Sequence, residues 1–385
     1  MKYMGSKRWM LRNGLGHLIQ DEIKTATRFV DLFSGSGVVA HFAATSGQSI
    51  EVIAYDLQLF SVTLAQSVIA RSTRLDPDSI RDAWLARATK KLTDSCRLSH
   101  ANRDTPDLRS GFTQKYVEQV RCDCAAEDFG PLTRAYGGYY FSLAQTLWLD
   151  ALRITLPELE SERSVALAAL IHAASQCAAS PGHTAQPFSP SIGAKEFLFD
   201  AWQRSVRAKT IGALNHLCLL HAGKIGRAGV ADANVAAEHI RKGDLVFLDP
   251  PYSGVHYSRF YHVLETVAQG NCGEVSGTGR YPPAEERPRS RYSVGTEAAS
   301  ALEGLLRKIA EKDARAILTF PQRRCSNGLS GSMVHEIASK FFLVTSTFKR
   351  SRFSTLGGTK NDDGDGYGRK ARQKTHELIL TLTPR

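Results

Sequence analysis

The sequence contains no long hydrophobic run. No stretch approaches the ~18 apolar residues of a membrane-spanning helix, and the N-terminal residues lack the apolar core of a secretory signal. We also find no long basic amphipathic helix, which argues against a membrane surface as the partner. The sequence therefore predicts a soluble, cytoplasmic protein that has no membrane partner.

Cysteine is scarce and scattered. The 385 residues include 7 cysteines, an odd number, and no two have Cys-x-x-Cys spacing. Cys122 and Cys124 are close in sequence, but no neighbouring cysteine or histidine pair completes a metal site around them. A chain of this length also buries enough apolar surface to fold without disulfides. We therefore expect reduced thiols and no metal.

Acidic residues are fewer than basic ones. The chain has 49 Lys and Arg against 38 Asp and Glu, a net charge of +11. An excess of this size favours a polyanionic partner such as nucleic acid, although a merely basic surface has the same composition. The hydrophobic content is that of an ordinary globular protein, and the length allows two domains.

Strand and helix patterns alternate in both terminal parts of the chain, which favours an α/β fold with a mostly parallel, doubly wound, Rossmann-like sheet. Because no helical pattern separates the last two strands, we expect them to pair antiparallel at one edge of the sheet. Helices are expected from about residue 38, over 58–71, and around the apolar stripe of Leu302, Leu305, Leu306 and Ile309. Strands are expected at 29–33, 51–56, about 226–230, 244–249, 314–320, 341–348 and 376–382.

The middle of the chain breaks this alternation. Residues 75–222 are richer in helical pattern and predict a second, mainly helical domain inserted between the two parts of the α/β domain, 1–74 and 223–385. Residues 271–296 and 354–374 are rich in glycine and predict long mobile loops, which often carry function. The clearest helices of the insert are expected at 139–153 and 164–179.

A glycine-rich turn follows the first expected strand, in the order Asp31-Leu32-Phe33-Ser34-Gly35-Ser36-Gly37. Glycines let the backbone turn tightly and approach a ligand, although many α/β proteins have such a turn for packing alone. The acid before the glycines suits a cationic ammonium better than a pyrophosphate. Asp56 ends the next strand, where an acid can bind ribose hydroxyls or simply end the strand.

The strongest motif is Asp249-Pro250-Pro251-Tyr252 at the end of an apolar strand. Each proline fixes φ and removes an N–H, so the turn is rigid and presents carbonyls. The Asp249 carboxylate and the Pro250 carbonyl can accept both hydrogens of an exocyclic amine, and Tyr252 offers a flat face to a base. An amine held in this way directs its lone pair at an electrophile.

Together these motifs make the sequence resemble the DNA adenine methylase family of S-adenosylmethionine-dependent enzymes. Three segments match in the family's order: Lys2-Tyr3-Met4-Gly5-Ser6-Lys7, then Asp31 to Gly37, then Asp249 to Tyr252. The resemblance covers roughly residues 1–70 and 225–385. The middle matches by position, and that position holds the family's target recognition domain.

The resemblance implies a methyltransferase sheet that binds S-adenosylmethionine and transfers its methyl group to N6 of an adenine in DNA. Asp249 to Tyr252 should bind the target amine, and Asp232 should contact the cofactor's adenine. The other implied cofactor contacts are Tyr3 and Lys7, then Asp31, Phe33, Gly35 and Gly37 at the methionine part, and Asp56 at the ribose.

Methylation of a base within a duplex requires the base to be flipped out, and therefore a grip on double-stranded DNA. Basic and aromatic residues near the motifs are candidates for this grip, although a solvated surface would have the same residues. Cognate restriction or defence-system proteins are further possible partners, and we expect a monomer or weak dimer. The candidates for nucleic-acid contact are Arg8, Tyr257, Arg259, Arg280, Arg289 and Arg352.

Two other readings remain open. The same amine-holding logic serves a methyltransferase that acts on RNA or on N4 of cytosine, but by the family resemblance an Asp at position 249 favours adenine. A non-catalytic DNA-binding subunit with this fold is the other alternative. The intact Asp249, Tyr252 and Gly35 argue against it, because a silent copy is free to lose them.

Overall fold

The computed structural model describes residues 6–354 and 372–385, and the chain forms two compact units. The α/β unit comprises residues 3–73, 221–257 and 288–385. Among the described residues, the helical unit comprises 74–220 and 258–287.

A seven-stranded sheet forms the centre of the α/β unit, in the order β3-β2-β1-β4-β5-β7-β6. Neighbours from β3 to β5 pair parallel, whereas β7 pairs antiparallel with β5 and β6. The predicted α/β fold and the antiparallel pairing of the last two strands are both confirmed. The strands are β1 (Arg28–Asp31), β2 (Glu51–Asp56), β3 (Arg227–Val230), β4 (Leu245–Leu248), β5 (Arg315–Pro321), β6 (Phe342–Ser354) and β7 (Arg372–Pro384).

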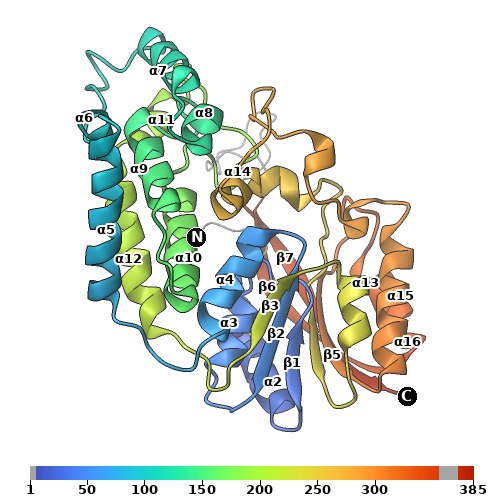
Figure 1. Ribbon diagram of the computed structural model, residues 1–385. Helices are drawn as coiled ribbons and strands as arrows, with labels where there is room; N and C mark the ends of the chain where they lie inside the picture. The colour runs from blue at the N-terminus through green and yellow to red at the C-terminus, as the bar shows by residue number, and fades with distance from the viewer. Residues whose placement is uncertain (1–5, 355–371) are drawn as a thin grey trace. The chain divides into compact units, whose positions relative to one another are not determined.

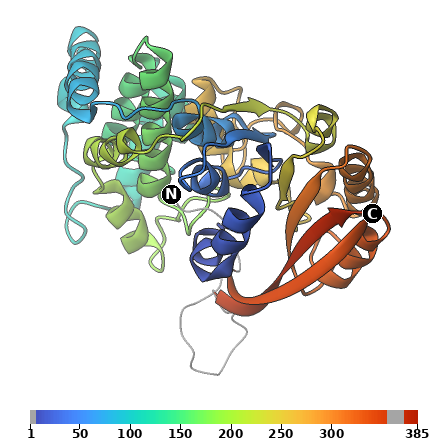
Figure 2. The same ribbon diagram turned by 90° about the horizontal axis from the view of Figure 1, so that it is seen from below.

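The last two strands are longer than the sequence predicts. We expected strands over 341–348 and 376–382, with a loop from 354 to 374 between them, but β6 and β7 pair in register from Phe342↔Pro384 to Ser354↔Arg372. Figure 2 shows them as one long twisted ribbon. Residues 355–371 of the predicted loop lie outside the described part of the chain.

Alternate residues of the central strands point into two separate cores, which is why these strands are apolar along their whole length. On β4, Leu245 and Phe247 join one core, whereas Val246 and Leu248 join the other. Figure 1 shows the helices that cover the two faces of the sheet. One face packs against α1 (Arg8–Met10), η1 (Leu11–Leu15), α2 (Gly16–Ile23), α3 (Val38–Ala44) and α4 (Leu59–Ile69). The other packs against α13 (Ala233–Ala236), η2 (Ala237–His239), η4 (Arg291–Ser293), α15 (Ala298–Glu311) and α16 (Gly331–Ser339).

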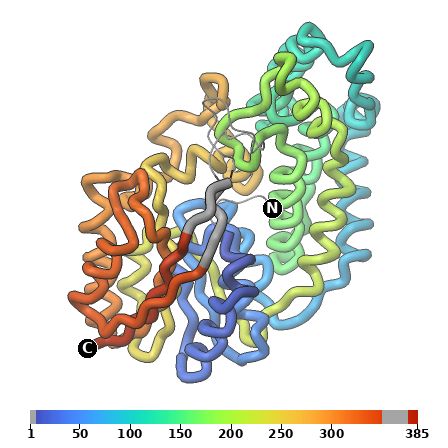
Figure 3. Tube along the Cα trace, turned by 180° about the vertical axis from the view of Figure 1, so that it is seen from behind, coloured from blue at the N-terminus to red at the C-terminus, as the bar shows by residue number. Residues whose placement is uncertain are grey.

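Long helices lie side by side in the helical unit, as Figure 3 shows for α5, α10 and α12. The expected helix at 139–153 begins only at Leu143, where Ser142 and Gln145 form a capping box. The helices of this unit are α5 (Pro77–Asp94), α6 (Leu98–Ala101), α7 (Gln114–Ala126), α8 (Pro131–Tyr136), α9 (Leu143–Ile154), α10 (Glu160–Cys177), α11 (Lys195–Trp202), α12 (Val206–Leu219), η3 (Ala284–Glu286) and α14 (Tyr257–Gln269), whose first residue belongs to the α/β unit.

Residues 258–287 pack with the helical unit, whereas the sequence analysis grouped them with the α/β domain. Two sets of hydrogen bonds explain the difference. The Thr184 backbone N–H and hydroxyl both donate to the Phe260 carbonyl, at 2.7 and 2.8 Å. The Arg153 guanidinium donates to the Val267 and Ala268 carbonyls near the end of α14. Contacts this distant along the chain leave no periodic signal in the sequence.

Within residues 6–354 and 372–385, no helix is long and apolar enough to cross a membrane. The same described residues contain no group of three or more His, Cys, Asp or Glu side chains that could hold a metal ion.

Candidate active site

Three carboxylates lie at one edge of the sheet. Asp31 is the last residue of β1, Asp56 is the last residue of β2, and Asp249 directly follows β4. Because β1 pairs parallel with both β2 and β4, the carboxyl ends of all three strands meet. The sheet therefore brings together the three acids that the sequence analysis selected.

The glycine-rich turn between β1 and α3 wraps around two of these acids. Gly35 and Gly37 have φ of +49° and +70°, a left-handed conformation that favours glycine. The Gly35 N–H donates to Asp56 Oδ2 at 2.8 Å, and the Phe33 N–H donates to Asp31 Oδ1 at 3.2 Å. The Asp31 side chain is only 1% exposed. The turn thus holds both carboxylates with backbone donors, and Asp31 is shielded from water whereas Asp56 is partly exposed.

Burial raises the pKa values of two carboxyl groups at this edge of the sheet. Burial is the main cause that raises the pKa of Asp31 to about 8, and the nearby charges of Asp249 and Asp56 raise it further. Burial also raises the pKa of Asp56 to about 6, although backbone donors at Gln58 and Gly35 act against the rise. Buried acids with raised pKa values favour the approach of a cation, which stabilises their ionised forms.

Two buried polar atoms in the same loops have no hydrogen-bond partner among the described residues. They are Ser34 Oγ, in the glycine-rich turn, and Gln58 Nε2, just after β2. Unsatisfied buried polar groups are rare in folded proteins and often indicate a missing ligand or water. These two atoms and the three carboxylates are polar groups in the loops at one edge of the sheet, and their chemistry fits a cofactor that bears an ammonium, a sulfonium and a ribose.

Asp249 is held from one side by a buried network. Lys7 Nζ lies 2.9 Å from Asp249 Oδ1 and 2.6 Å from Glu377 Oε1. The Thr319 hydroxyl, on β5, donates to the same Asp249 Oδ1 at 2.9 Å. Both contacts of Asp249 therefore fall on Oδ1, and Oδ2 has no bonded donor among the described residues. One oxygen is anchored while the other remains free to accept a ligand's hydrogen.

The charges of this network depend on each other. Burial by itself lowers the pKa of Lys7, but attraction to Asp249 and Glu377 outweighs burial and raises it, so the ammonium stays charged. Burial raises the pKa of Asp249, and Lys7 acts against that rise while Glu377 adds to it. Glu377 thus shares the Lys7 ammonium with Asp249. Because the ammonium interacts with both carboxylates, it weakens Asp249 less as a hydrogen-bond acceptor than it would alone.

The Asp249 to Tyr252 turn is fixed by neighbouring loops of the same unit. Asn327 Nδ2 donates to the Pro251 carbonyl at 2.9 Å, whereas the Pro250 carbonyl has no bonded donor in the described ranges. Tyr252 is buried, and its ring meets the Tyr257 ring edge-on at 6.4 Å between centroids. The turn therefore leaves the Pro250 carbonyl as an acceptor and presents a braced aromatic ring.

The other residues predicted to contact the cofactor lie in different surroundings. Asp232 follows β3 at the same edge of the sheet and caps α13, because its Oδ1 accepts the Asn234 N–H at 2.8 Å. Phe33 packs edge-on against Tyr292 at 5.0 Å. Lys7, predicted to reach toward the cofactor, contacts Asp249 instead. Tyr3 lies outside the described residues.

The candidates for nucleic-acid contact fall into both units. In the α/β unit Arg8 is exposed and Tyr257 is partly exposed, whereas the Arg289 charge is matched by Glu297 at 2.7 Å. Arg352 lies on β6, and its side chain is not among those described. In the helical unit, Arg259 and Arg280 each lie over a tyrosine ring. The structure does not bring all six into one unit.

Several residues of the site were not predicted from the sequence. Ser34 and Gln58 directly adjoin the chosen acids, and their positions in the motif loops could have identified them. Glu377, Thr319 and Asn327 carry no local signal, because pairing of distant strands and loops brings them to Asp249 and its turn.

Comparison with known proteins shows that the chain is similar to DNA methyltransferases. Residues 3–122 match the family model described as D12 class N6 adenine-specific DNA methyltransferase. The chain is 25% identical over 311 residues to the modification methylase LlaI of Lactococcus lactis subsp. lactis, covering 80% of this chain and 44% of the relative. It is 26% identical over 321 residues to the type II methyltransferase M.FokI of Planomicrobium okeanokoites, covering 80% and 43%.

The chain thus spans less than half the length of these two relatives. The type II methyltransferase M.NlaIII of Neisseria lactamica is closer in size, with 25% identity over 358 residues that cover 89% of this chain and 88% of the relative. The family match includes the glycine-rich turn and Asp56, and each of the three pairings extends over most of the chain. The resemblance that the motifs predicted is confirmed: the chain is similar to the D12 class N6 adenine-specific DNA methyltransferases over residues 3–122 and to modification methylases over most of its length.

Proposed function

We propose that this chain transfers a methyl group from S-adenosylmethionine to N6 of an adenine in double-stranded DNA. The observation that carries the proposal is the arrangement at Asp249. Its Oδ1 is anchored by Lys7 and Thr319, and the next residue offers an unengaged carbonyl. Two acceptors on a rigid turn match the two hydrogens of an exocyclic amine.

The cofactor would supply an electrophilic methyl group. Asp31, with its raised pKa, would bind the cofactor's ammonium, and Asp56 would accept hydrogen bonds from the ribose hydroxyls. Ser34 Oγ and Gln58 Nε2 are the unpartnered polar atoms that would complete the pocket. Asp232, Phe33, Lys7 and Tyr3 remain candidates for its periphery.

The turn would act on the target base chiefly by positioning it. Asp249 Oδ2 and the Pro250 carbonyl would each accept one hydrogen of the amine, which directs the nitrogen lone pair at the methyl carbon. The Tyr252 ring would stack on the base. The nitrogen becomes strongly acidic only once its new bond to carbon has formed, so it can then release its proton to water and no dedicated base is required.

The helical unit, with residues 75–222 as its main part, would act as the target recognition domain. The target would be site-specific and flipped out of the duplex. The relatives are named as a modification methylase and a type II methyltransferase, which supports a role in restriction–modification or defence, with cognate proteins as partners. We expect a cytoplasmic monomer or weak dimer.

The test is methyl transfer from labelled S-adenosylmethionine to genomic DNA that lacks methylation, followed by mass spectrometry of the nucleosides. N6-methyldeoxyadenosine is the expected product, and it should be absent with the Asp249→Ala variant. Appearance of N4-methylcytosine, or transfer to RNA alone, would replace the target with one of the alternative substrates. Cofactor binding without any transfer would favour the non-catalytic DNA-binding subunit.

A further inference from the structure

Two tyrosine rings on the helical unit each carry two arginines. The Arg121 guanidinium carbon lies 4.3 Å from the centre of the Tyr139 ring, and that of Arg280 lies 4.7 Å from the same centre. The Tyr281 ring carries Arg259 at 4.5 Å and Arg287 at 5.6 Å. Since Arg280 and Tyr281 adjoin in sequence, the two groups are neighbours. We call these six residues the arginine–tyrosine surface.

Backbone carbonyls fix the arginines from behind. Arg121 Nε donates to the Gly138 carbonyl at 3.0 Å, and Arg280 Nε donates to the Ala135 carbonyl at 2.9 Å. Arg287 Nε donates more weakly to the Pro283 carbonyl at 3.4 Å. Arg280 Nη2 also donates weakly to the Arg134 carbonyl at 3.4 Å. A guanidinium held through Nε and stacked on a ring otherwise keeps terminal nitrogens for another ligand.

The chain accepts local strain at Arg280. Its φ of +53° is left-handed, a conformation that non-glycine side chains rarely adopt, at a four-residue turn closed by the bridge between Ser276 and Tyr281. Gly279, just before it, also has to be small, because a Cβ there would lie 2.3 Å from the Tyr281 ring. A glycine or asparagine at 280 would relieve the strain, so an arginine there indicates that its side chain is used.

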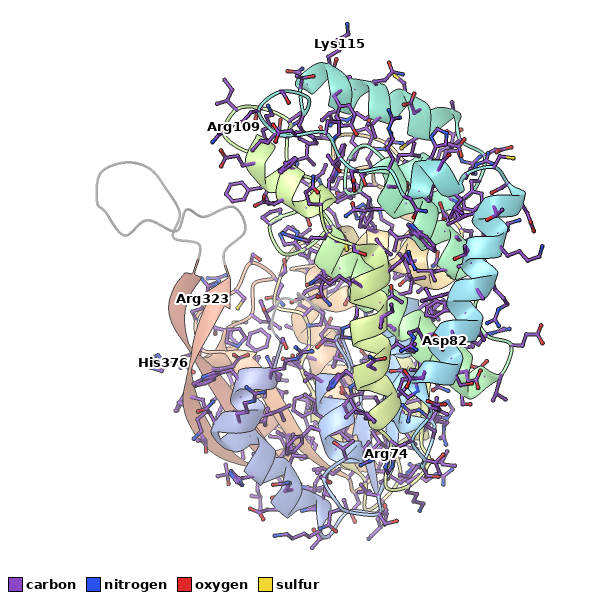
Figure 4. The ribbon with its side chains drawn as sticks, turned by 90° about the vertical axis from the view of Figure 1, so that its left-hand side faces the viewer. Arg74, Asp82, Arg109, Lys115, Arg323 and His376 are labelled. Carbon is purple, nitrogen blue, oxygen red and sulfur yellow. The ribbon has the colours of Figure 1, made fainter. Side chains whose placement is uncertain are left out.

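Within the described residues, none of these four arginines has a carboxylate partner in an ion pair. Some cations elsewhere in the unit do: Arg81 pairs with Asp78 and with Asp82, which Figure 4 labels on α5. The charges of the surface also act on a buried side chain. Burial is the main cause that lowers the pKa of His262 to about 4, and the charges of Arg287 and Arg259 lower it further. Four unneutralised like charges on two rings repel one another, and a bound anion would relieve that repulsion.

We propose that the arginine–tyrosine surface binds consecutive phosphates of the DNA backbone. The inference rests on the proposed function, which supplies DNA as the polyanion. Planar guanidinium groups bind phosphate oxygens through paired N–H donors, and tyrosine stacking orients them in advance. The contacts carry no base information, so the surface gives affinity and register while other residues read the sequence.

The test measures the salt dependence of binding to a short labelled DNA duplex of arbitrary sequence, without cofactor. Each lost phosphate contact should reduce the slope of log affinity against log salt by about 0.9. The pair Arg121→Gln and Arg280→Gln should therefore lower the slope by about two contacts, and the pair Arg259→Gln and Arg287→Gln should do so independently. Lysine replacements at the same positions keep the charge, so they should preserve the slope while weakening binding.

Arg207 provides the matched control, because it is an exposed arginine of the same unit that stacks on Trp148 at 4.7 Å but has no second arginine on its ring. Arg207→Gln should leave the slope unchanged. An equal effect of Arg207→Gln, an unchanged slope in both folded double variants, or slope changes seen with duplex RNA but not DNA would each overturn the proposal. Because arbitrary DNA requires no target adenine, methyl transfer by the wild type distinguishes failure of this surface from failure of the proposed function.

Discussion

In the α/β unit most ionisable side chains of the site are acids, with Lys7 among them, whereas in the helical unit the clustered ionisable side chains are arginines stacked at the surface. Asp31 and Asp56 have raised pKa values because little water reaches them. Arg121 and Arg280 have no carboxylate partner in the described ranges and lie on a ring instead. The first arrangement favours a small cation and the second favours a polyanion. The difference teaches that one chain can serve both kinds of ligand by keeping its uncompensated charges of opposite sign in separate units.

Asp249→Ala should have the largest effect, and the effect should fall on methyl transfer and not on cofactor affinity. Loss of the anchored acceptor should reduce kcat on the order of 10²–10³-fold, comparable to the loss of one preorganised catalytic hydrogen-bonding group. The fold should persist, because Lys7 keeps Glu377 as its partner at 2.6 Å. Methyl transfer and cofactor affinity are measured side by side.

The matched control for this variant is Asp21→Ala, which removes an exposed acid of the same unit that pairs only with Lys24 at the surface. It should leave kcat unchanged. Normal turnover by Asp249→Ala would remove Asp249 from the reaction, and an altered salt slope of DNA binding would break the separation of roles between the units.

Asp56→Ala should act on cofactor binding rather than on DNA. Hydrogen bonds to a charged group contribute about 1.5–3 kcal/mol, so the dissociation constant for S-adenosylmethionine should rise on the order of 10- to 100-fold. Asp56→Asn removes the charge and keeps one acceptor oxygen, so it can accept from either the Gly35 or the Gln58 N–H group but not from both. Calorimetry measures the constant, and an unchanged value in both variants would exclude Asp56 from the pocket.

Local patterns predicted the acidic side of this comparison better than the cationic side. Asp31, Asp56 and Asp249 each end or follow a short apolar strand, and parallel pairing has to bring such ends together. Glu377 could not be found in this way, because it reaches Lys7 only through the antiparallel pairing of β7 with β5. Arg280 was selected for its charge alone, since neither its left-handed backbone nor its stacking on Tyr139 has a sequence pattern.

Glu377→Gln should have a smaller effect that is specific to the chemistry. Without Glu377 the Lys7 ammonium interacts with Asp249 alone and weakens it as an acceptor, so we expect kcat to fall about tenfold with cofactor affinity unchanged. Because Glu377 also raises the pKa of Asp249, its removal should move the acidic limb of the pH–rate profile to lower pH. A merely structural role would not move that limb.

Glu303→Gln is the comparison for this variant, since Glu303 pairs with Lys340 at 3.1 Å on the surface of the same unit. It should change neither kcat nor the pH profile. If the two variants behave alike, the buried network does not tune Asp249.

The smallest effect is a change of cofactor affinity with pH. Asp31 in the free protein has a pKa of about 8, mainly through burial, and the cofactor's ammonium would favour its ionised form. Binding should therefore release a proton and strengthen several-fold from about pH 6 toward pH 8, until the cofactor's own amino group loses its charge near ~7.7–8.0. Because the folded pKa of Asp31 lies above the ordinary 3.8, this group stabilises the cofactor-free protein at low pH, and its contribution is lost as pH rises through about 8.

Calorimetry in buffers of different ionisation enthalpy counts the proton released on cofactor binding, and Asp31→Asn should abolish that release. Proton uptake on binding, or a cofactor affinity independent of pH, would mean that Asp31 does not lose a proton when the cofactor's ammonium binds. The salt slope of DNA binding should be the same in the wild type and in Asp31→Asn.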